Sequence, residues 1–404
     1  MNIEFMRFID RCVGSLVCFI FSFINSLHSL FSKKQISIKK ILFIELSEMG
    51  STILGFPMFM EVKSGYPDAD LHFLTFHKNR CAVDILSFFR TENIWTLNND
   101  TLCSFLLNTI KLVKIYRKIG VDTVIIMEPF SRFTVIFSKL CGINRIVGFT
   151  AHNMEGLYMG NLLTHPVPFN SSIHMKDNYI ALFRSLSITD ISSFYIKQPV
   201  SNVDNFIPLW KTSKDSLDSI RQKLKKYHHT FNNNYKIILL KVGGGLLPTR
   251  KWPLDNFIAL AKKMLSSENI CICIVGLEED EHDAKIIKEI LNTSLCINLT
   301  GKTSINELMD LFNLADLLIT NDGGPAHFAS MTTIPSIVFF GPETPALFKP
   351  LSKNCYPLYS KFYCSPCLSV FNKRKTDCMD NVCIKNIQVE TVFELALDIL
   401  SKNS

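Results

Sequence analysis

Two series of alternating strands and helices run along this 404-residue chain, and they limit its possible folds more than any other feature. Short apolar runs, such as residues 41–46, 121–127, 236–241 and 317–320, alternate with amphipathic segments of ten or more residues. Strands that alternate with helices usually become parallel neighbours in one sheet. The pattern therefore predicts an α/β protein with doubly wound parallel sheets.

The alternation lapses between about residues 204 and 235, where a charged helical segment and a polar stretch interrupt it. We therefore predict an N-terminal Rossmann-like domain over residues 39–204, a linker region over 205–234 and a C-terminal Rossmann-like domain over 235–404. The length agrees with two domains, since a domain typically takes roughly 100–200 residues. We expect a cleft between the two sheets.

Residues 1–38 differ in composition from the rest of the chain. Up to residue 40, basic residues exceed acidic ones by four, which is more than half of the net charge of +7. Between the basic flanks, residues 12–31 carry no formal charge and are long enough to span a bilayer. Asn25 and His28 weaken that interpretation, so a spanning or interfacial helix and a buried helix both stay open. The basic flanks favour the anionic cytoplasmic face of a membrane.

The segment 319–330 (ITNDGGPAHFAS) is the strongest candidate site. A buried strand ends at Thr320, a glycine turn follows, and Pro325 suits the first position of a helix. Backbone N–H groups at such a corner can bind phosphate, and open α/β sheets bind ligands at the carboxyl ends of their strands. A structural role stays open, in which Asp322 only caps the helix. The candidate ligand-binding residues are Thr320, Asp322, Gly323, Gly324 and His327.

Two further strand ends belong to the same predicted sheet. After the strand at 236–241, Gly243-Gly244-Gly245 leads to Arg250-Lys251-Trp252-Pro253, where Lys251 can neutralise a diphosphate. After the strand at 270–275, Glu278 can accept hydrogen bonds from ribose hydroxyls. A solvated basic loop and a solvated helix N-terminus are the alternatives.

Together these segments resemble glycosyltransferase family 9, the bacterial ADP-heptose:lipopolysaccharide heptosyltransferases, over most of residues 39–400. Residues 320–327 (TNDGGPAH) are close to the family pattern T-[DN]-[ST]-G-[PG]-x-H, and residues 251–253 resemble its K-x-W-P. Residues 41–57 and 65–70 resemble its first strand, loop and αβ turn. The resemblance implies the GT-B fold, in which two Rossmann-like domains face each other.

The resemblance also implies roles for matching residues. Lys251 would neutralise the diphosphate of a nucleotide-sugar, and Glu278 would hold its ribose or adenosine part. Asp322, Gly323, Gly324 and His327 would line the donor pocket. Fixed hydrogen-bond donors can stabilise the anionic leaving group, so we expect neither a cofactor nor a catalytic metal.

The first loop departs from the family pattern. The family usually has G-D there, and this aspartate is the expected general base, but Gly50 is followed by Ser51. Glu48 lies in the same loop and carries a carboxylate, so we predict that Glu48 takes the role of the base. The alternative is that Glu48 only caps a helix, with the base elsewhere or activity lost.

Four of the thirteen cysteines cluster near the C-terminus, in the pattern C-x2-C-x10-C-x4-C. This spacing is compatible with a structural zinc site, with disulfides or with free thiols. We do not place them in the active site. The four residues are Cys364, Cys367, Cys378 and Cys383.

We therefore expect an inverting, metal-independent transferase that moves a heptose, or a related sugar, from an ADP-activated donor to a lipopolysaccharide core or another glycolipid. The alternatives are a nucleotide-sugar-binding protein that lost its base at Ser51, and a transferase for another nucleotide-sugar. A nicotinamide dehydrogenase is disfavoured because no G-x-G-x-x-G follows the first strand. We expect no binding to nucleic acid, because the excess charge surrounds an apolar segment.

Overall fold

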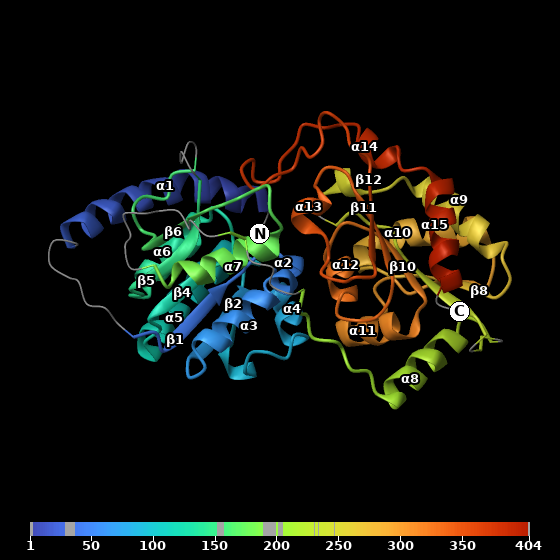
Figure 1. Cartoon of the computed structure of the whole chain (residues 1–404), viewed down its shortest axis with the longest axis horizontal. Coiled ribbons are helices and arrows are strands. Elements are labelled where there is room, and N and C mark those ends of the chain that lie inside the picture. The colour runs from blue at the N-terminus through green and yellow to red at the C-terminus, as the bar shows by residue number, and fades with distance from the viewer. Residues whose placement is uncertain are drawn as a thin grey trace. The chain divides into compact units, whose positions relative to one another are not determined.

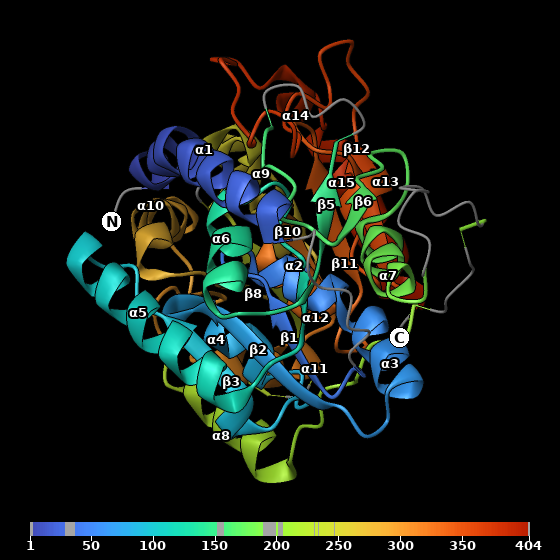
Figure 2. The same ribbon diagram turned by 90° about the vertical axis from the view of Figure 1, so that its left-hand side faces the viewer.

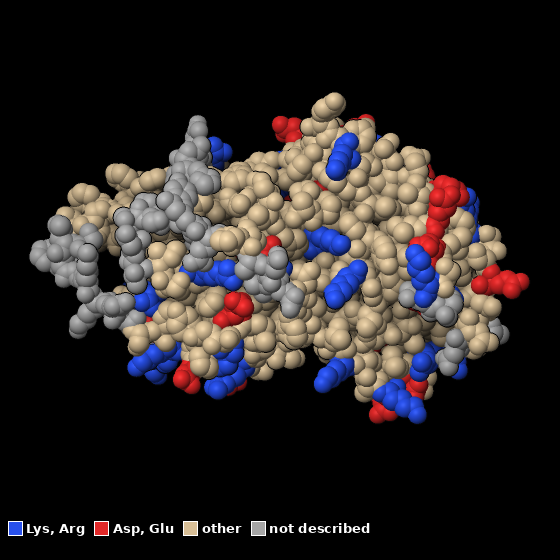
Figure 3. All heavy atoms as spheres, in the orientation of Figure 1, with Lys and Arg blue, Asp and Glu red and all other residues tan. Residues whose placement is uncertain are grey.

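The computed structural model describes residues 3–28, 37–151, 157–188, 199–200, 205–229, 231–232, 234–245 and 247–402. The chain divides into two compact units, Met1–Asp204 and Asn205–Ser404. The basic residues Lys33 and Lys34 and the end of the uncharged segment, residues 29–31, lie outside the described residues. On the face drawn in Figure 3, lysine and arginine side chains are scattered among uncharged residues.

Unit 1 is built on a six-stranded sheet in which all neighbouring strands are parallel (Figure 1). The strand order is β3-β2-β1-β4-β5-β6. The strands are β1 (Lys40–Ile44), β2 (Asp70–Phe76), β3 (Ile94–Leu97), β4 (Thr123–Ile126), β5 (Arg145–Thr150) and β6 (His165–Pro168). The central strands are buried on both faces, which explains why they appear in the sequence as unbroken apolar runs.

Helices cover the sheet of unit 1, and one of them differs from the sequence pattern. The apolar periodicity predicts a single helix over residues 51–63, but two helices meet at Gly55. Pro57 has no N–H to continue the hydrogen-bond ladder, which accounts for the break. The helical segments are α1 (Ile3–His28), α2 (Met49–Leu54), α3 (Phe56–Gly65), η1 (His77–Asn79), α4 (Arg80–Asp84), η2 (Thr91–Asn93), α5 (Leu102–Ile119), α6 (Arg132–Leu140) and α7 (Met175–Ser185).

Two elements of unit 1 were not predicted. Strand β6 is short and contains Pro166 and Pro168, so its sequence does not look like a strand. Proline is tolerated there because β6 is the edge strand of the sheet. Helix α7 follows and packs against α3, which brings Tyr179 into the interior of unit 1.

Unit 2 repeats the same strand pattern in a second parallel sheet, in the order β12-β11-β10-β7-β8-β9. Strand β12 was not predicted, because it is only half-buried. The strands are β7 (Lys236–Lys241), β8 (Ile270–Ile274), β9 (Cys296–Asn298), β10 (Leu317–Asn321), β11 (Ser336–Phe340) and β12 (Cys355–Tyr359). The α/β class with doubly wound parallel sheets is confirmed in both units.

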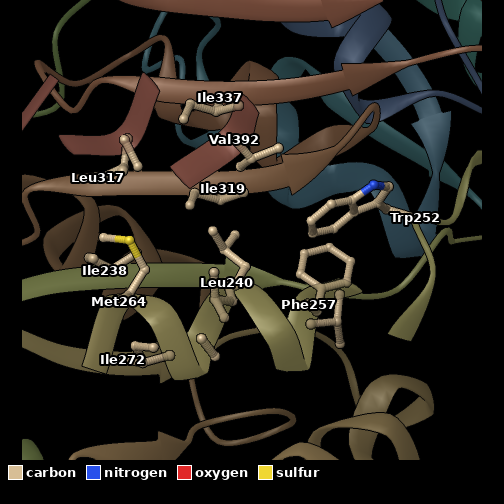
Figure 4. Close-up of a cluster of buried hydrophobic side chains, with 14 of the residues drawn as sticks. Ile238, Leu240, Trp252, Phe257, Met264, Ile272, Leu317, Ile319, Ile337 and Val392 are labelled. Atoms are coloured by element: carbon tan, nitrogen blue, oxygen red, sulfur yellow. The ribbon is translucent and has the colours of Figure 1, made fainter. Parts of the chain in front are cut away.

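The helices of unit 2 enclose a hydrophobic core that includes Trp252 (Figure 4). Trp252 is fully buried, and its ring centroid lies 4.9 Å from that of Phe257 and 4.7 Å from that of Phe339. The helical segments are α8 (Lys214–Lys225), η3 (Pro248–Arg250), α9 (Leu254–Leu265), η4 (Glu278–Asp280), α10 (Glu281–Leu291), α11 (Ile305–Leu314), α12 (Gly324–Ala329), α13 (Pro345–Phe348), α14 (Val382–Lys385) and α15 (Val389–Lys402).

In each sheet, successive strands are first added on one side of the first strand and later on its other side. We call the place between these two sets of strands the reversal point. In unit 1 this point lies between β1 and β4, and in unit 2 it lies between β7 and β10. Crevices at the carboxyl ends of such strand pairs are the usual ligand sites of open α/β sheets. The loops that the sequence singled out follow β1, β7 and β10, so they lie at these two points.

Candidate functional site

The two loops at the reversal point of unit 2 are joined by Asn321, the last residue of β10. Its side-chain Nδ2 donates to the carbonyl oxygens of Val242 and Gly243, at 3.0 and 3.1 Å. Its Oδ1 accepts a hydrogen bond of 2.9 Å from the backbone N–H of Trp252. Asn321 is buried, so each of these bonds satisfies a backbone group that water cannot reach. The amide therefore fixes the distance between the glycine loop and the 320–327 segment.

Lys251 is held at the surface of this edge because the next residue is anchored in the core. The indole N–H of Trp252 donates to the carbonyl oxygen of Ile387 at 2.9 Å, while its backbone N–H donates to Asn321. The ammonium group of Lys251 forms an ion pair with Asp283 and stays partly exposed. A partly exposed lysine beside a glycine loop is able to bind a phosphate group.

Asp322 belongs to a buried ionic network that the sequence did not reveal. Arg250 Nη2 lies 2.6 Å from Glu343 Oε2, and Arg250 Nε lies 3.7 Å from Asp322 Oδ2. Arg374 Nε reaches the other oxygen of Glu343 at 3.0 Å. Two arginines and two carboxylates thus link the segment after β10 with the segments after β7, β11 and β12.

Burial decides the protonation of the two acids in this network. Desolvation raises the pKa of Glu343 to about 7, although the Arg250 guanidinium opposes the shift. Desolvation also raises the pKa of Asp322, again against the attraction of Arg250. The site can therefore hold a proton close to neutral pH, which is a common property of functional sites.

The acids after β8 divide into an exposed and a buried one. Glu278 is exposed at the carboxyl edge of the sheet, beside Gly301. Asp280 is buried, and its Oδ2 lies 3.1 Å from Lys241 Nζ. A Cβ atom on Gly243 would lie 1.6 Å from Asp280 Oδ1, so glycine is required there for close approach. Asp280 packs the loop after β8 against the loop after β7, a role that the sequence pattern does not predict.

The remaining predicted donor residues lie where β10 joins α12. Thr320 and His327 are buried, while Gly323 and Gly324 are partly exposed. The backbone of Gly323 is extended, and no atom lies within 4 Å of the position that a Cβ atom would take. There is open space in front of this glycine, so it is not needed for packing.

At the reversal point of unit 1, three glutamates gather after β1 and β4. The Glu45 carboxylate is buried and accepts hydrogen bonds from the backbone N–H groups of Ser47 and Glu48, at 3.3 and 3.1 Å. Ser47 Oγ donates to Glu128 Oε1 at 2.7 Å, and Ser51 Oγ donates to Glu48 Oε2 at 2.8 Å. The structure thus brings both predicted residues, Glu48 and Ser51, into direct contact.

Tyr179 of the unpredicted helix α7 completes this edge. Burial, together with the nearby carboxylate of Glu45, raises the pKa of its phenol well above the usual range. The phenol therefore stays protonated beside the glutamates. Glu45 and Glu128 share one signal in the sequence, since each follows the last residue of a buried strand by no more than two positions.

The four C-terminal cysteines form no disulfide, as is true of all thirteen cysteines. Among the described residues, no three His, Cys, Asp or Glu side chains are arranged to hold a metal ion. Only Cys383 is buried, and its thiol pKa is raised, first by burial.

Two doubly wound sheets, each with its candidate residues at the reversal point, define a protein of the GT-B fold class. Residues 163–376, just over half of the chain, match glycosyltransferase family 9 (heptosyltransferase). The chain therefore belongs to this family.

Curated relatives agree with the family. The chain is 34% identical to lipooligosaccharide heptosyltransferase 2 of Haemophilus influenzae over 26% of this chain and 31% of that protein. It is 28% identical to lipooligosaccharide heptosyltransferase 2 of Campylobacter jejuni over 43% of this chain and 53% of that protein. The matches thus span 31% and 53% of these two relatives.

A solved structure supports the fold over nearly the whole chain. The ADP-heptose lipopolysaccharide heptosyltransferase II of Escherichia coli aligns with a TM-score of 0.68 at 19% identity, covering 90% of this chain and 99% of that one. The predicted GT-B fold is thereby confirmed.

Proposed function

We propose that this protein transfers a heptose, or a related sugar, from an ADP-activated donor to a lipopolysaccharide core or another glycolipid. Unit 2 binds the nucleotide-sugar and unit 1 binds the acceptor. Membership of the heptosyltransferase family supports sugar transfer, and the similar E. coli protein is described as an ADP-heptose enzyme. No metal or cofactor takes part in this proposal, because protein side chains supply the positive charge.

The observation that carries the proposal is the arrangement of the three strand ends of unit 2. Lys251 offers a partly exposed cation beside the glycine loop, and Gly323 has open space before it. Glu278 is exposed at the same edge and suits the ribose hydroxyls. A diphosphate that lies between Lys251 and the 320–327 segment has positive charge on the side where negative charge develops.

In unit 1, Glu48 is the proposed general base. Its carboxylate takes the proton of the acceptor hydroxyl, whose oxygen forms a bond to the anomeric carbon while the bond from that carbon to the diphosphate breaks. Attack from the side opposite to the leaving group inverts the configuration. Ser51 donates a hydrogen bond to Glu48 and so orients it, in place of the aspartate that the family usually has.

The acceptor requires a membrane surface, because a glycolipid is anchored in a bilayer. Helix α1 contains a segment, Phe8–Leu27, that is long and apolar enough to cross a membrane. The net positive charge around it favours an anionic surface. We therefore propose that the protein works at the cytoplasmic face of the bacterial inner membrane.

Thermal shift with ADP, GDP, UDP and dTDP sugars, followed by a transfer assay with the best donor, tests this function. A donor at 100 times its Kd stabilises the native protein by about 2.7 kcal/mol. We expect ADP-sugars to give the largest shift and wild type to turn over the donor. Stabilisation by a donor without turnover would support the alternative, a binding protein that lost its base at Ser51. If none of the four nucleotide-sugars stabilises the protein, both the transferase and the binding protein are contradicted.

A further inference from the structure

We infer that α1 and α5 together form a lipid-docking face that lies flat on an anionic bilayer, so that α1 does not span it. The inference rests on the membrane-bound acceptor of the proposed function and names the surface that meets the membrane. Figure 2 shows α1, α6 and α5 on the side of unit 1 that is turned toward the viewer.

One side of α1 is bound to unit 1 by polar and small residues. The Asp10 carboxylate accepts hydrogen bonds from the backbone N–H groups of Arg132 and Phe133, at 3.0 and 2.9 Å, and pairs with the buried Arg132 guanidinium at 3.4 Å. Gly14 lies directly against the Arg132 side chain. Farther along α1, Asn25 Nδ2 donates to the carbonyl oxygen of Asn161 at 3.2 Å. These contacts are spread along most of the helix.

The other side of α1 is an apolar stripe in solvent. Its side chains are between 48% and 65% exposed, namely Phe8, Val13, Leu16, Phe19, Ile20, Phe23, Ile24 and Leu27. A spanning helix would have to leave unit 1 and bury Asp10 and Asn25 in hydrocarbon without these partners, which is costly. A helix that keeps its contacts with unit 1 and exposes one apolar face instead has the properties of an interfacial helix.

Helix α5 offers a second exposed face with the same chemistry. Its first half exposes Leu102, Leu106, Leu107 and Ile110. Its second half exposes Lys111, Lys114, Arg117 and Lys118, and the helix contains no acidic residue. Leucines followed by lysines on one helix face suit the boundary between acyl chains and anionic headgroups.

The two faces are joined through α6. The backbone N–H of Phe133 donates to Asp10 of α1, while the Phe133 ring lies 4.9 Å from the ring of Phe105 on α5. One residue of α6 therefore contacts both helices. Both helices therefore neighbour α6 on the same side of unit 1 (Figure 2).

Charge favours a bilayer over a second copy of the chain as the occupant. The four exposed cations of α5 would face the same four cations of a symmetric partner, and like charges repel. On α1, Asp10 faces inward and is paired, so it does not oppose an anionic surface. Anionic lipids supply the complementary charge.

Sedimentation of the full chain with vesicles tests the inference, using phosphatidylcholine alone and phosphatidylcholine mixed with phosphatidylglycerol. The charge-reversal variant is Lys114→Glu with Lys118→Glu on α5. Its matched control is Lys225→Glu with Lys226→Glu at the C-terminal end of α8. The apolar variant is Phe19→Asp with Phe23→Asp on α1, and its matched control is Ile290→Asp on α10. All of these side chains are exposed, and circular dichroism checks that each variant folds.

We expect wild type to prefer the anionic vesicles. Each lost basic residue weakens binding about fivefold, so the α5 variant should bind roughly 25-fold or more weakly at low salt. The α1 variant should bind at least tenfold more weakly to both vesicle types, and the controls should bind as wild type does. High salt should remove the effect of the α5 variant, since the Debye length falls to about 3 Å at 1 M.

Three results would overturn the inference. One is an α5 variant that binds like wild type, and another is a chain from native membranes that resists extraction by alkaline carbonate, as a spanning helix does. The third is a wild type that forms a dimer and does not bind vesicles, together with an α5 variant that no longer forms the dimer. Vesicle binding needs neither donor nor acceptor, so a failure of the proposed transfer reaction would leave this result interpretable.

Discussion

At the scale of single residues, the first loop of unit 1 departs from the usual pattern of its family. Ser51 occupies the position of the aspartate, and its hydroxyl donates to Glu48. The loop itself is held by the buried Glu45, which accepts from two of its backbone N–H groups. The carboxylate next to Ser51 thus belongs to an ordered loop, which a general base requires.

We predict that Glu48→Gln lowers kcat by roughly 10²–10⁴-fold, because glutamine keeps the shape but cannot take a proton. The donor Kd should stay within twofold, because Glu48 belongs to unit 1 and the donor residues to unit 2. Steady-state kinetics and a donor titration measure the two effects. Glu92→Gln, an exposed glutamate of unit 1, serves as the control. Unchanged kcat in Glu48→Gln would remove Glu48 from the mechanism.

Glu343 predicts a pH dependence of stability with a defined sign. Burial raises its pKa from 4.5 to about 7, so between these values the native state holds a proton that the unfolded state has released. Stability from this residue is therefore greatest at low pH and falls as the pH rises from about 4.5 to 7. Glu343→Gln cannot titrate and should lose this dependence.

The measurement is Tm of wild type and Glu343→Gln between pH 4.5 and 8. The Tm of wild type should fall by a few degrees relative to the variant over this range. His165, whose pKa burial lowers to about 4, contributes with the opposite sign in both proteins and cancels in the difference. Glu394→Gln, an exposed glutamate, should run parallel to wild type. A difference that does not depend on pH would contradict the prediction.

At the scale of elements, glycines at the strand ends of unit 2 have two different structural roles. Gly243 follows β7 and lies against Asp280, where no side chain fits. Gly323 follows β10, is extended and has open space around the position of a Cβ atom. The first glycine serves packing, and the second leaves room at the proposed donor site.

Alanine at the two glycines should therefore give opposite results. Gly243→Ala displaces Asp280 from Lys241 and should cost roughly 3 kcal/mol or more, because a buried ion pair is broken. Gly323→Ala should change the free energy of unfolding by less than about 1 kcal/mol, yet weaken donor binding by about tenfold. Denaturant unfolding and a donor titration measure these effects. Wild-type donor affinity in Gly323→Ala would place the donor elsewhere.

At the scale of the whole molecule, the chain consists of two units with the same strand order and different chemistry. Unit 1 gathers glutamates and a tyrosine at its reversal point, and it carries α1 on its surface. Unit 2 gathers lysine, arginine and glycines around Asn321. The proposed division of labour, with the acceptor on unit 1 and the donor on unit 2, rests on this difference.

Calorimetry of the full chain tests this division. ADP at 100 times its Kd should raise the transition of unit 2 by roughly 5–10 °C, given about 2.7 kcal/mol of linkage and 2–4 °C per kcal/mol for a unit of this size. Gly243→Ala should lower the same transition and leave the other one in place. If ADP shifts only the other transition, which Gly243→Ala leaves in place, the donor does not bind to unit 2.

The sequence alone determined the two parallel sheets, most strand bounds and the segments 251–253 and 320–327. These features depend on local periodicity and on turn residues, which are visible in neighbouring positions. It missed β6 and β12, because prolines or half-buried side chains obscure their patterns, and it also missed the helices α7 and α15.

Only the tertiary structure decided which polar groups meet. Glu343 and Arg374 are distant in the sequence from Asp322 and Arg250, and only the order of β7, β10 and β11 in the sheet brings them into one network. Likewise, α1 has an apolar composition that suits several environments. Packing against α6 selects one side for the protein and leaves the other exposed, because Asp10 finds its partner in Arg132, more than a hundred residues away.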